Sequence, residues 1–107
     1  MVHLIAYELA GIRMPDETAR IEGGIKDLGP AYAFHKSTWL VESELSNKEI
    51  SERLSGLVRP KDRLLVMRIH KDWSTANVAD AESDWLTSRN YTSVNDPPTF
   101  PTARPQR

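Results

Sequence analysis

The sequence predicts a small α+β domain, and three observations support that prediction. Residues 2–9 form a short, almost unbroken apolar run, which is typical of a strand buried on both faces in the middle of a sheet. Residues 31–43 are rich in aromatic and β-branched side chains, which also favour strands. After each of these stretches, a segment with apolar residues at helical spacing follows, so helices alternate with strands.

The first predicted helix begins at Pro15, because the missing N–H of a proline costs nothing in the first helical turn. One stripe of this helix is expected to be buried: Thr18, Ile21, Ile25 and Leu28. Gly23 and Gly24 each weaken the helix by about 1 kcal/mol relative to alanine. Close packing on a sheet would explain this glycine pair, and chance would explain it equally well. Gly29 and Pro30 end the helix.

Residues 31–43 are too long for one typical strand, so we divide them near Lys36 and Ser37 into two strands joined by a tight turn. In the second strand the alternation of side chains places Trp39 and Val41 on the same face as Ser37. The opposite face carries Thr38, Leu40 and Glu42.

The second helix has the clearest local signal in the chain. Ser46 is predicted to be its N-cap, and Glu49 three residues later completes a capping box. Ile50, Leu54 and Leu57 form its buried stripe, and Pro60 ends it. Residues 63–69 follow with four apolar residues at their centre, which predicts a second buried strand.

Residues 72–90 resemble a weaker helix that starts near Ser74 or Thr75, with Val78, Ala81 and Trp85 on one face. From residue 91 the composition shifts to proline and polar residues. We therefore expect one domain over residues 1–90 and an extended or disordered Pro-rich tail over residues 91–107. Deleting this tail is expected to change stability little.

The predicted order is strand, helix, strand, strand, helix, strand, followed by an added helix and the tail. A hairpin between two helical crossovers defines the split βαβ, or ferredoxin-like, pattern (βαββαβ). The first and third strands should be central in the sheet, and we expect them to be parallel. The stretch after residue 69 is where such a domain could extend its sheet or dimerise.

The composition limits the function classes. The net charge is -1 and the pI is near 6.3, so no overall basic excess points to a nucleic-acid binder. The sequence has no cysteine, which excludes disulfides, thiolate zinc sites and cysteine nucleophiles. It shows no signal-peptide pattern and no apolar run of about 18 residues, so a cytoplasmic protein without a membrane partner is expected.

Two stretches resemble a known family. Ile5-Ala6-Tyr7-Glu8-Leu9 is similar to the first strand of the small CRISPR-associated endonucleases of the adaptation complex, which ends in Tyr-Asp. Residues 35–41 and 62–66, read as His-Lys-Ser-Thr-Trp-Leu-Val and Asp-Arg-Leu-Leu-Val, look closer still to uncharacterised bacterial proteins called SinR-like. Both groups resemble the virulence-associated D-type toxins. The resemblance covers roughly residues 2–70.

The resemblance implies a ferredoxin-like homodimer. In that family one carboxylate per subunit, at the end of the first strand, approaches the dimer axis and binds a divalent metal for phosphodiester cleavage; other members hold DNA without cleaving it. By position this carboxylate is Glu8, which would act as catalytic residue and as ligand of Mg²⁺ or Mn²⁺. Glutamate replaces the family's aspartate here, so a shared metal would have to sit elsewhere.

The ordinary interpretation of Glu8 is a strand-end glutamate in a salt bridge, with Arg13 or Arg68 as partner. Four residues are candidate nucleic-acid contacts: Ser37, Arg63, Arg68 and Lys71. The ordinary interpretation of Ser37 is a strand hydroxyl that pairs across the hairpin, and that of the three basic residues is a solvated junction between helix and strand. A wider basic rim around the last strand would also include Arg59 and Lys61, with Asp62 and Asp72 diluting it.

Other candidate residues have mainly structural interpretations. His3, His35 and His70 lie on or beside predicted strands, and no two of them have the spacing of metal ligands on a helix. Three tryptophans could stack on bases, although burial in a core or dimer interface is the commoner role: Trp39, Trp73 and Trp85.

The sequence therefore supports a metal-dependent endonuclease centred on Glu8 or, as the alternative, a non-enzymatic dimeric scaffold or binding protein with a degenerate metal site. A third class, a small-molecule-binding domain, would need a pocket between the sheet and its helices. Whatever surrounds Glu8 in the folded protein discriminates between the first two.

Overall fold

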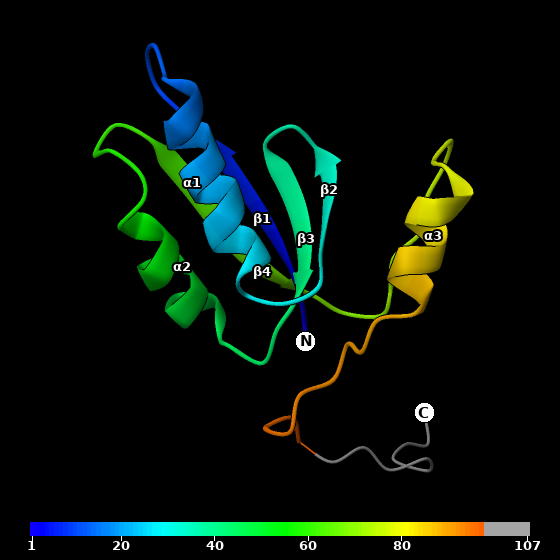
Figure 1. The fold of residues 1–107 in the computed structure, drawn as a ribbon. Helices are drawn as coiled ribbons and strands as arrows, with labels where there is room; N and C mark the ends of the chain where they lie inside the picture. The colour runs from blue at the N-terminus through cyan, green and yellow to red at the C-terminus, as the bar shows by residue number, and fades with distance from the viewer. Residues whose placement is uncertain (98–107) are drawn as a thin grey trace, which may run out of the picture.

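The computed structural model describes residues 1–97. These residues form four strands and three helices in the order β1 (Val2–Glu8), α1 (Pro15–Lys26), β2 (Ala31–His35), β3 (Thr38–Glu42), α2 (Asn47–Ser55), β4 (Arg63–Ile69) and α3 (Asp80–Thr87). The strands make one sheet in the order β2-β3-β1-β4 (Figure 1). The predicted ferredoxin-like arrangement with an added helix is confirmed.

The two central strands are β1 and β3, as expected, but the prediction that they are parallel is wrong. They pair antiparallel, with Ile5 opposite Trp39 and His3 opposite Val41. The reason lies in the connections: a helical crossover brings β2 back parallel to β1, and the hairpin then reverses the chain into β3. The position predicted for this hairpin is correct, because Lys36 and Ser37 separate β2 from β3.

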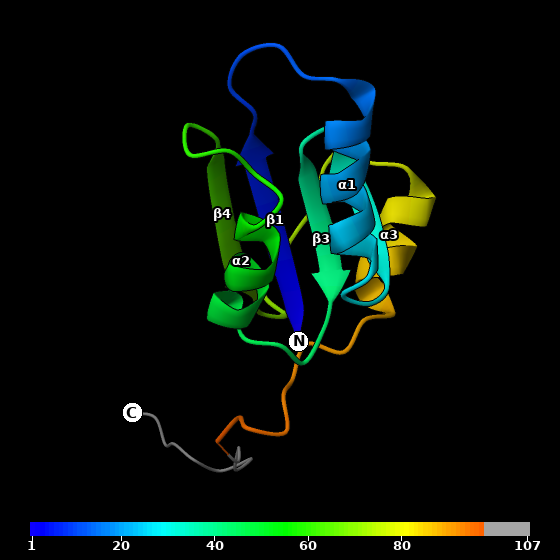
Figure 2. The same ribbon diagram turned by 60° about the vertical axis from the view of Figure 1, so that its left-hand side comes forward.

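The hydrophobic core lies between one face of the sheet and the two helices α1 and α2, which lie side by side over it (Figures 1 and 2). Eight buried residues form the central cluster: Ile5, Tyr7, Ile21, Ile25, Trp39, Val41, Ile50 and Leu54. The predicted helix stripes therefore face the core. At α2, the Ser46 hydroxyl accepts the Glu49 N–H and the Glu49 carboxylate accepts the Ser46 N–H, so the predicted capping box is present.

The glycine pair in α1 has two different environments. A Cβ on Gly24 would lie 2.6 Å from Cδ1 of Leu57 and 3.2 Å from Cδ2 of Leu54, whereas a Cβ on Gly23 would meet nothing within 4 Å. Close packing therefore explains Gly24, and the neighbours are Leu54 of α2 and Leu57 just after it rather than the sheet.

The opposite side of the sheet, which we call the open face, is only partly covered. The strand register places Leu4 and Ala6 of β1 beside Met67 and Leu65 of β4 on this face. Leu65 and Met67 are 50% and 44% exposed, and Phe34 of β2 is 48% exposed. Residues 2–9 were predicted to be buried on both faces of the sheet, and this is only partly correct. On the open face Val2 is buried, but Leu4 and Ala6 are half-buried.

The prediction that residues 63–69 form a buried strand is wrong. β4 is an edge strand, and exposed and half-buried residues alternate along most of it. Its four consecutive apolar residues suggested two covered faces, but only the face that carries Leu64 and Val66 packs against the core cluster.

Helix α3 begins at Asp80, whereas the sequence predicted a start near Ser74 or Thr75, which lie six and five residues earlier. Asn77 has a φ of 61°, a left-handed conformation that interrupts a right-handed helix. The helix lies beside β2 (Figure 1). There the ring of Trp85 packs on Tyr32 with ring centroids 6.0 Å apart, and Leu86 is buried.

Residues 91–97, which fall in the segment expected to be extended or disordered, have no helix or strand but lie against the domain. Tyr91 is buried, and its hydroxyl donates to the Leu86 carbonyl at 2.6 Å. The Arg68 guanidinium donates to both carboxylate oxygens of Asp96, at 2.8 and 2.7 Å, and to the Tyr91 carbonyl at 2.9 Å. The rest of the proposed tail, residues 98–107, lies outside the described residues.

The Arg68–Asp96 pair makes stability depend on pH. Hydrogen bonds from Arg68 and from the Ser93 N–H lower the pKa of Asp96 to about 2. A carboxylate with a depressed pKa stabilises the fold above its unfolded pKa and loses that contribution as the pH falls, here between about pH 4 and pH 2. We expect Asp96→Asn to reduce the loss of melting temperature across this window, whereas Asp84→Asn on the exposed side of α3 should leave it as in the wild type. Identical profiles for all three proteins would contradict this role of Asp96.

Candidate functional site

Glu8 ends β1 on the open face of the sheet. The register of β1 and β4 sets it directly opposite Arg63, and the two side chains form an ion pair with 3.5 Å between Nη1 and Oε1. The partner is therefore neither Arg13 nor Arg68, the two arginines named from the sequence. With 72% of Glu8 and 83% of Arg63 exposed, the pair lies in water and contributes little to stability.

A shallow hollow of about 390 Å³ lies beside this pair, lined by Ala6, Tyr7, Glu8, Arg63, Leu64 and Leu65. Its walls are mostly apolar apart from the two charges. One chain supplies a single carboxylate here, and the neighbouring guanidinium repels a divalent cation. Within residues 1–97, no three His, Cys, Asp or Glu side chains are grouped so that they could hold a metal ion. Glu8 would need a second chain or a nucleic-acid phosphate to complete the coordination of Mg²⁺.

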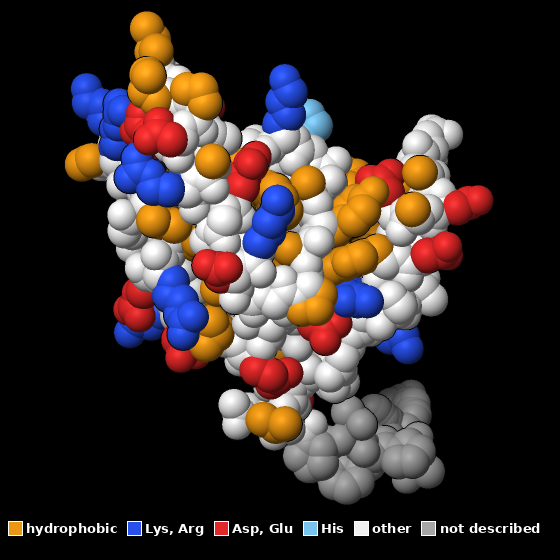
Figure 3. Space-filling view, viewed as in Figure 1, with side chains coloured by type: hydrophobic (Ala, Val, Ile, Leu, Met, Phe, Trp, Pro, Cys, Tyr) orange, Lys and Arg blue, Asp and Glu red, His pale blue; other side chains and the backbone are white. Residues whose placement is uncertain are grey.

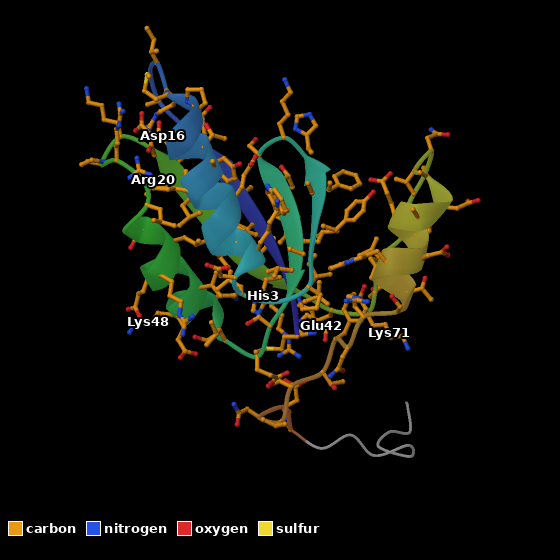
Figure 4. All side chains as sticks on the ribbon, in the orientation of Figure 1. His3, Asp16, Arg20, Glu42, Lys48 and Lys71 are labelled. Atoms are coloured by element: carbon orange, nitrogen blue, oxygen red, sulfur yellow. The ribbon has the colours of Figure 1, made fainter. Side chains whose placement is uncertain are left out.

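The four candidate nucleic-acid contacts do not come together. Ser37 lies in the β2–β3 turn, where its carbonyl accepts the Tyr7 N–H at 3.0 Å, so it is at the same end of the sheet as Glu8 and Arg63. Arg68 and Lys71 lie at the other end of β4, where Figure 4 labels Lys71. Six residue steps separate Arg63 from Ile69, or about 20 Å along the strand.

Most of the proposed basic rim is neutralised by acidic partners. Arg59 donates to both carboxylate oxygens of Glu17, Arg63 pairs with Glu8, and Arg68 pairs with Asp96. In the view of Figure 3, acidic and basic side chains alternate over α1 and α2 without a large patch of one sign. The surface in this view therefore lacks the basic stripe that is typical of nucleic-acid binding.

Sequence reasoning missed an extensive polar network that centres on Asp62. Its carboxylate accepts the Ala10 N–H at 2.8 Å, the Arg59 N–H at 2.7 Å, and the guanidinium of Arg13. Burial raises the pKa of Asp62, but the hydrogen bonds from Arg59, Ala10 and Arg13 outweigh it, and the net shift lowers the pKa. The network fixes the loop after β1 to the loop before β4, which is a structural role.

The arginine that this network buries also contacts helix α1. Arg13 pairs with Glu17 at 3.3 Å, four residues further along the chain. This spacing and the three-residue separation of Arg59 and Asp62 were local signals of the network, but Arg13 and Asp62 are 49 residues apart, so the sequence did not show that they meet.

One histidine and one tryptophan are buried in the domain, and the other two histidines are exposed. His3 is 1% exposed, and its Nδ1 lies 2.7 Å from Oδ1 of Asn47, whereas His35 and His70 are exposed and distant along the chain. Figure 4 shows His3 within the body of the domain near the end of β3 marked by Glu42. Trp39 belongs to the core cluster, so its ring cannot stack on a base.

A second, apolar groove of about 280 Å³ separates the open face from the segment that leads into α3. Leu4, Phe34 and Leu40 of the sheet line one side, and Trp73, Val78 and Leu86 line the other. Figure 3 shows hydrophobic side chains between the sheet and α3. This groove lies on the face away from α1 and α2, not between the sheet and those helices.

No family model and no curated protein matches the chain. Among residues 1–97, no helix is long and apolar enough to span a bilayer.

Proposed function

We propose that this chain is a homodimeric, non-enzymatic binding or scaffold protein related in type to the family that its sequence resembles, with Glu8 released from a catalytic role. The observation that carries this proposal is the Glu8–Arg63 ion pair. A guanidinium 3.5 Å from the carboxylate places positive charge where a divalent cation would have to bind.

The open face supports the dimeric part of the proposal. It presents three large apolar side chains that are 44 to 50% exposed, Phe34, Leu65 and Met67, with Leu4 and Ala6 half-buried among them. Leu65 and Met67 are neighbours on the open face of the edge strand β4, and apolar side chains grouped at an exposed edge mark a surface where another molecule binds. A second copy of the chain is the partner that the resemblance implies.

The second candidate function is a metal-dependent endonuclease with Glu8 as ligand of Mg²⁺ or Mn²⁺. One observation favours it: Glu8 is 72% exposed, beside a hollow open to solvent. An exposed ion pair is weak, so a bound cation could displace Arg63, whose guanidinium would then be free to contact a phosphate oxygen. Nucleic acid is the substrate class of this alternative.

A nuclease assay separates the two functions. Single- and double-stranded RNA and DNA are incubated with Mg²⁺ or Mn²⁺ and either wild type, Glu8→Ala or Glu52→Ala, an exposed carboxylate on α2 that serves as the control. The scaffold proposal predicts the same background cleavage in all three. Metal-dependent cleavage that is lost only in Glu8→Ala would overturn it and establish the endonuclease.

A further inference from the structure

The two edges of the sheet differ in how they are protected. β2, at one edge, has five residues, a register shift between Ala33 and His35, and the ring of Trp85 packed on Tyr32. β4, at the other edge, has seven residues and pairs with β1 in an unbroken register from Arg63 to Ile69. Short, bulged and covered edges resist pairing with other strands, whereas long, regular ones invite it.

The hydrogen-bonding direction of β4 follows from its neighbours. The Tyr7 N–H donates toward β3, to the Ser37 carbonyl, and the Met1 carbonyl accepts the Ser43 N–H on the same side. Because backbone groups alternate in direction along a strand, the even-numbered residues of β1 face β4. Their register partners are Arg63, Leu65, Met67 and Ile69. The N–H and C=O groups of Leu64, Val66 and Arg68 therefore point outward, away from the sheet.

The side chains of this edge are incompletely buried on both faces. Leu64 and Val66 face the helices but are only half-buried, and Leu65 and Met67 are half-exposed on the open face. Figure 2 shows β4 as the outermost strand on its side of the sheet. Within residues 1–97, no strand pairs with its outer edge.

We propose that the outer edge of β4 pairs antiparallel with β4 of a second copy, about a two-fold axis at Val66, so that the two four-stranded sheets form one continuous sheet. This inference rests on the homodimer proposed above and specifies its interface. The outward backbone groups of Val66 meet those of the partner's Val66, and those of Leu64 meet those of the partner's Arg68.

The side chains of β4 suit this pairing with itself. Leu65 lies opposite the partner's Met67 on the open face, so each of these half-exposed side chains gains an apolar cross-strand neighbour. Arg63 lies opposite the partner's Ile69, so no two like charges of the strand face each other. A two-fold interface requires such self-complementarity.

Mass and amide exchange of the full chain test this interface. Light scattering at micromolar concentration should give twice 12.1 kDa for the wild type. The amide of Val66, which points away from β1, should exchange slowly in this dimer and should exchange faster as dilution dissociates it.

Two proline variants provide a matched comparison. Val66→Pro removes an outward N–H that the isolated domain does not use, so the variant should remain folded and have the monomer mass of 12.1 kDa. Leu65→Pro removes an N–H that faces Ala6 of β1, and it should unfold the domain.

The outcomes distinguish the interface from the proposed function. A wild-type mass of 12.1 kDa would overturn both the interface and the homodimer. A dimer with rapid exchange at Val66 and an unchanged mass in Val66→Pro would overturn the edge pairing alone and would point to the open face as the interface. Slow exchange at Val66 in a monomer bound to a different protein would show that the edge accepts a foreign strand, which also overturns the proposal.

Discussion

Replacing Gly29 with alanine is expected to lower the free energy of unfolding by at least about 3 kcal/mol. Gly29 lies between α1 and β2 with a φ of 152°, a backbone conformation that residues other than glycine rarely adopt. A Cβ at this position would overlap the carbonyl oxygen of Glu42, a backbone atom that cannot turn aside. Relief would require moving β3, whose Glu42 N–H also bonds the Pro30 carbonyl at 2.9 Å.

Gly23→Ala is the matched control for this substitution. Gly23 lies within α1, and an added Cβ there meets nothing within 4 Å. Alanine should stabilise the helix by about 0.5–1 kcal/mol, because glycine loses more backbone entropy on folding. Urea unfolding of the two variants should therefore shift the midpoint in opposite directions, and a Gly29→Ala midpoint equal to that of the wild type would contradict the predicted overlap.

Replacing Ile5 with alanine is expected to cost about 2–5 kcal/mol, the range for deleting a large aliphatic side chain in a core. Ile5 is 0% exposed on the central strand and belongs to the core cluster, with β3 and β4 on either side. The cavity would be enclosed by elements from both halves of the fold, so little of it could close by local movement.

Ile12→Ala makes the same chemical change at a position that is 91% exposed in the loop after β1. Its free energy of unfolding should lie within about 0.5 kcal/mol of the wild-type value. Chemical denaturation at low protein concentration measures both variants without a contribution from association. If Ile5→Ala and Ile12→Ala lowered the free energy of unfolding equally, the core would not lie where the structure places it.

The sequence predicted best those elements whose signal lies within a few neighbouring residues of the chain. Pro15 begins α1, the reciprocal pair of Ser46 and Glu49 caps α2, and the turn at Lys36 and Ser37 separates β2 from β3. Each signal depends on a backbone preference or a hydrogen bond between near neighbours, which tertiary contacts did not override.

The elements predicted poorly depend on what lies beside them in space. The apolar centre of residues 63–69 is compatible with a central or an edge strand, and only the sheet order decides between them. The start of α3 depends on Asn77, whose left-handed conformation has no strong signal in the sequence.

For the candidate site, the position of Glu8 at an exposed strand end was predictable, and its partner was not. Arg63 faces Glu8 because of the β1–β4 register, which a single-residue shift would change. Arg13, one of the two partners named from the sequence, instead binds Asp62.

The central position of β1 has a consequence for the synthesis of the chain. β1 is made first among the strands, but it pairs with β3 and β4, and its last partner ends at Ile69. Because synthesis adds about 5–20 residues per second, several seconds pass between the synthesis of β1 and that of the strands that flank it. During that time the run from Val2 to Tyr7 is an unpaired, aggregation-prone segment, so the nascent protein is expected to depend on ribosome-associated chaperones more than its small size suggests.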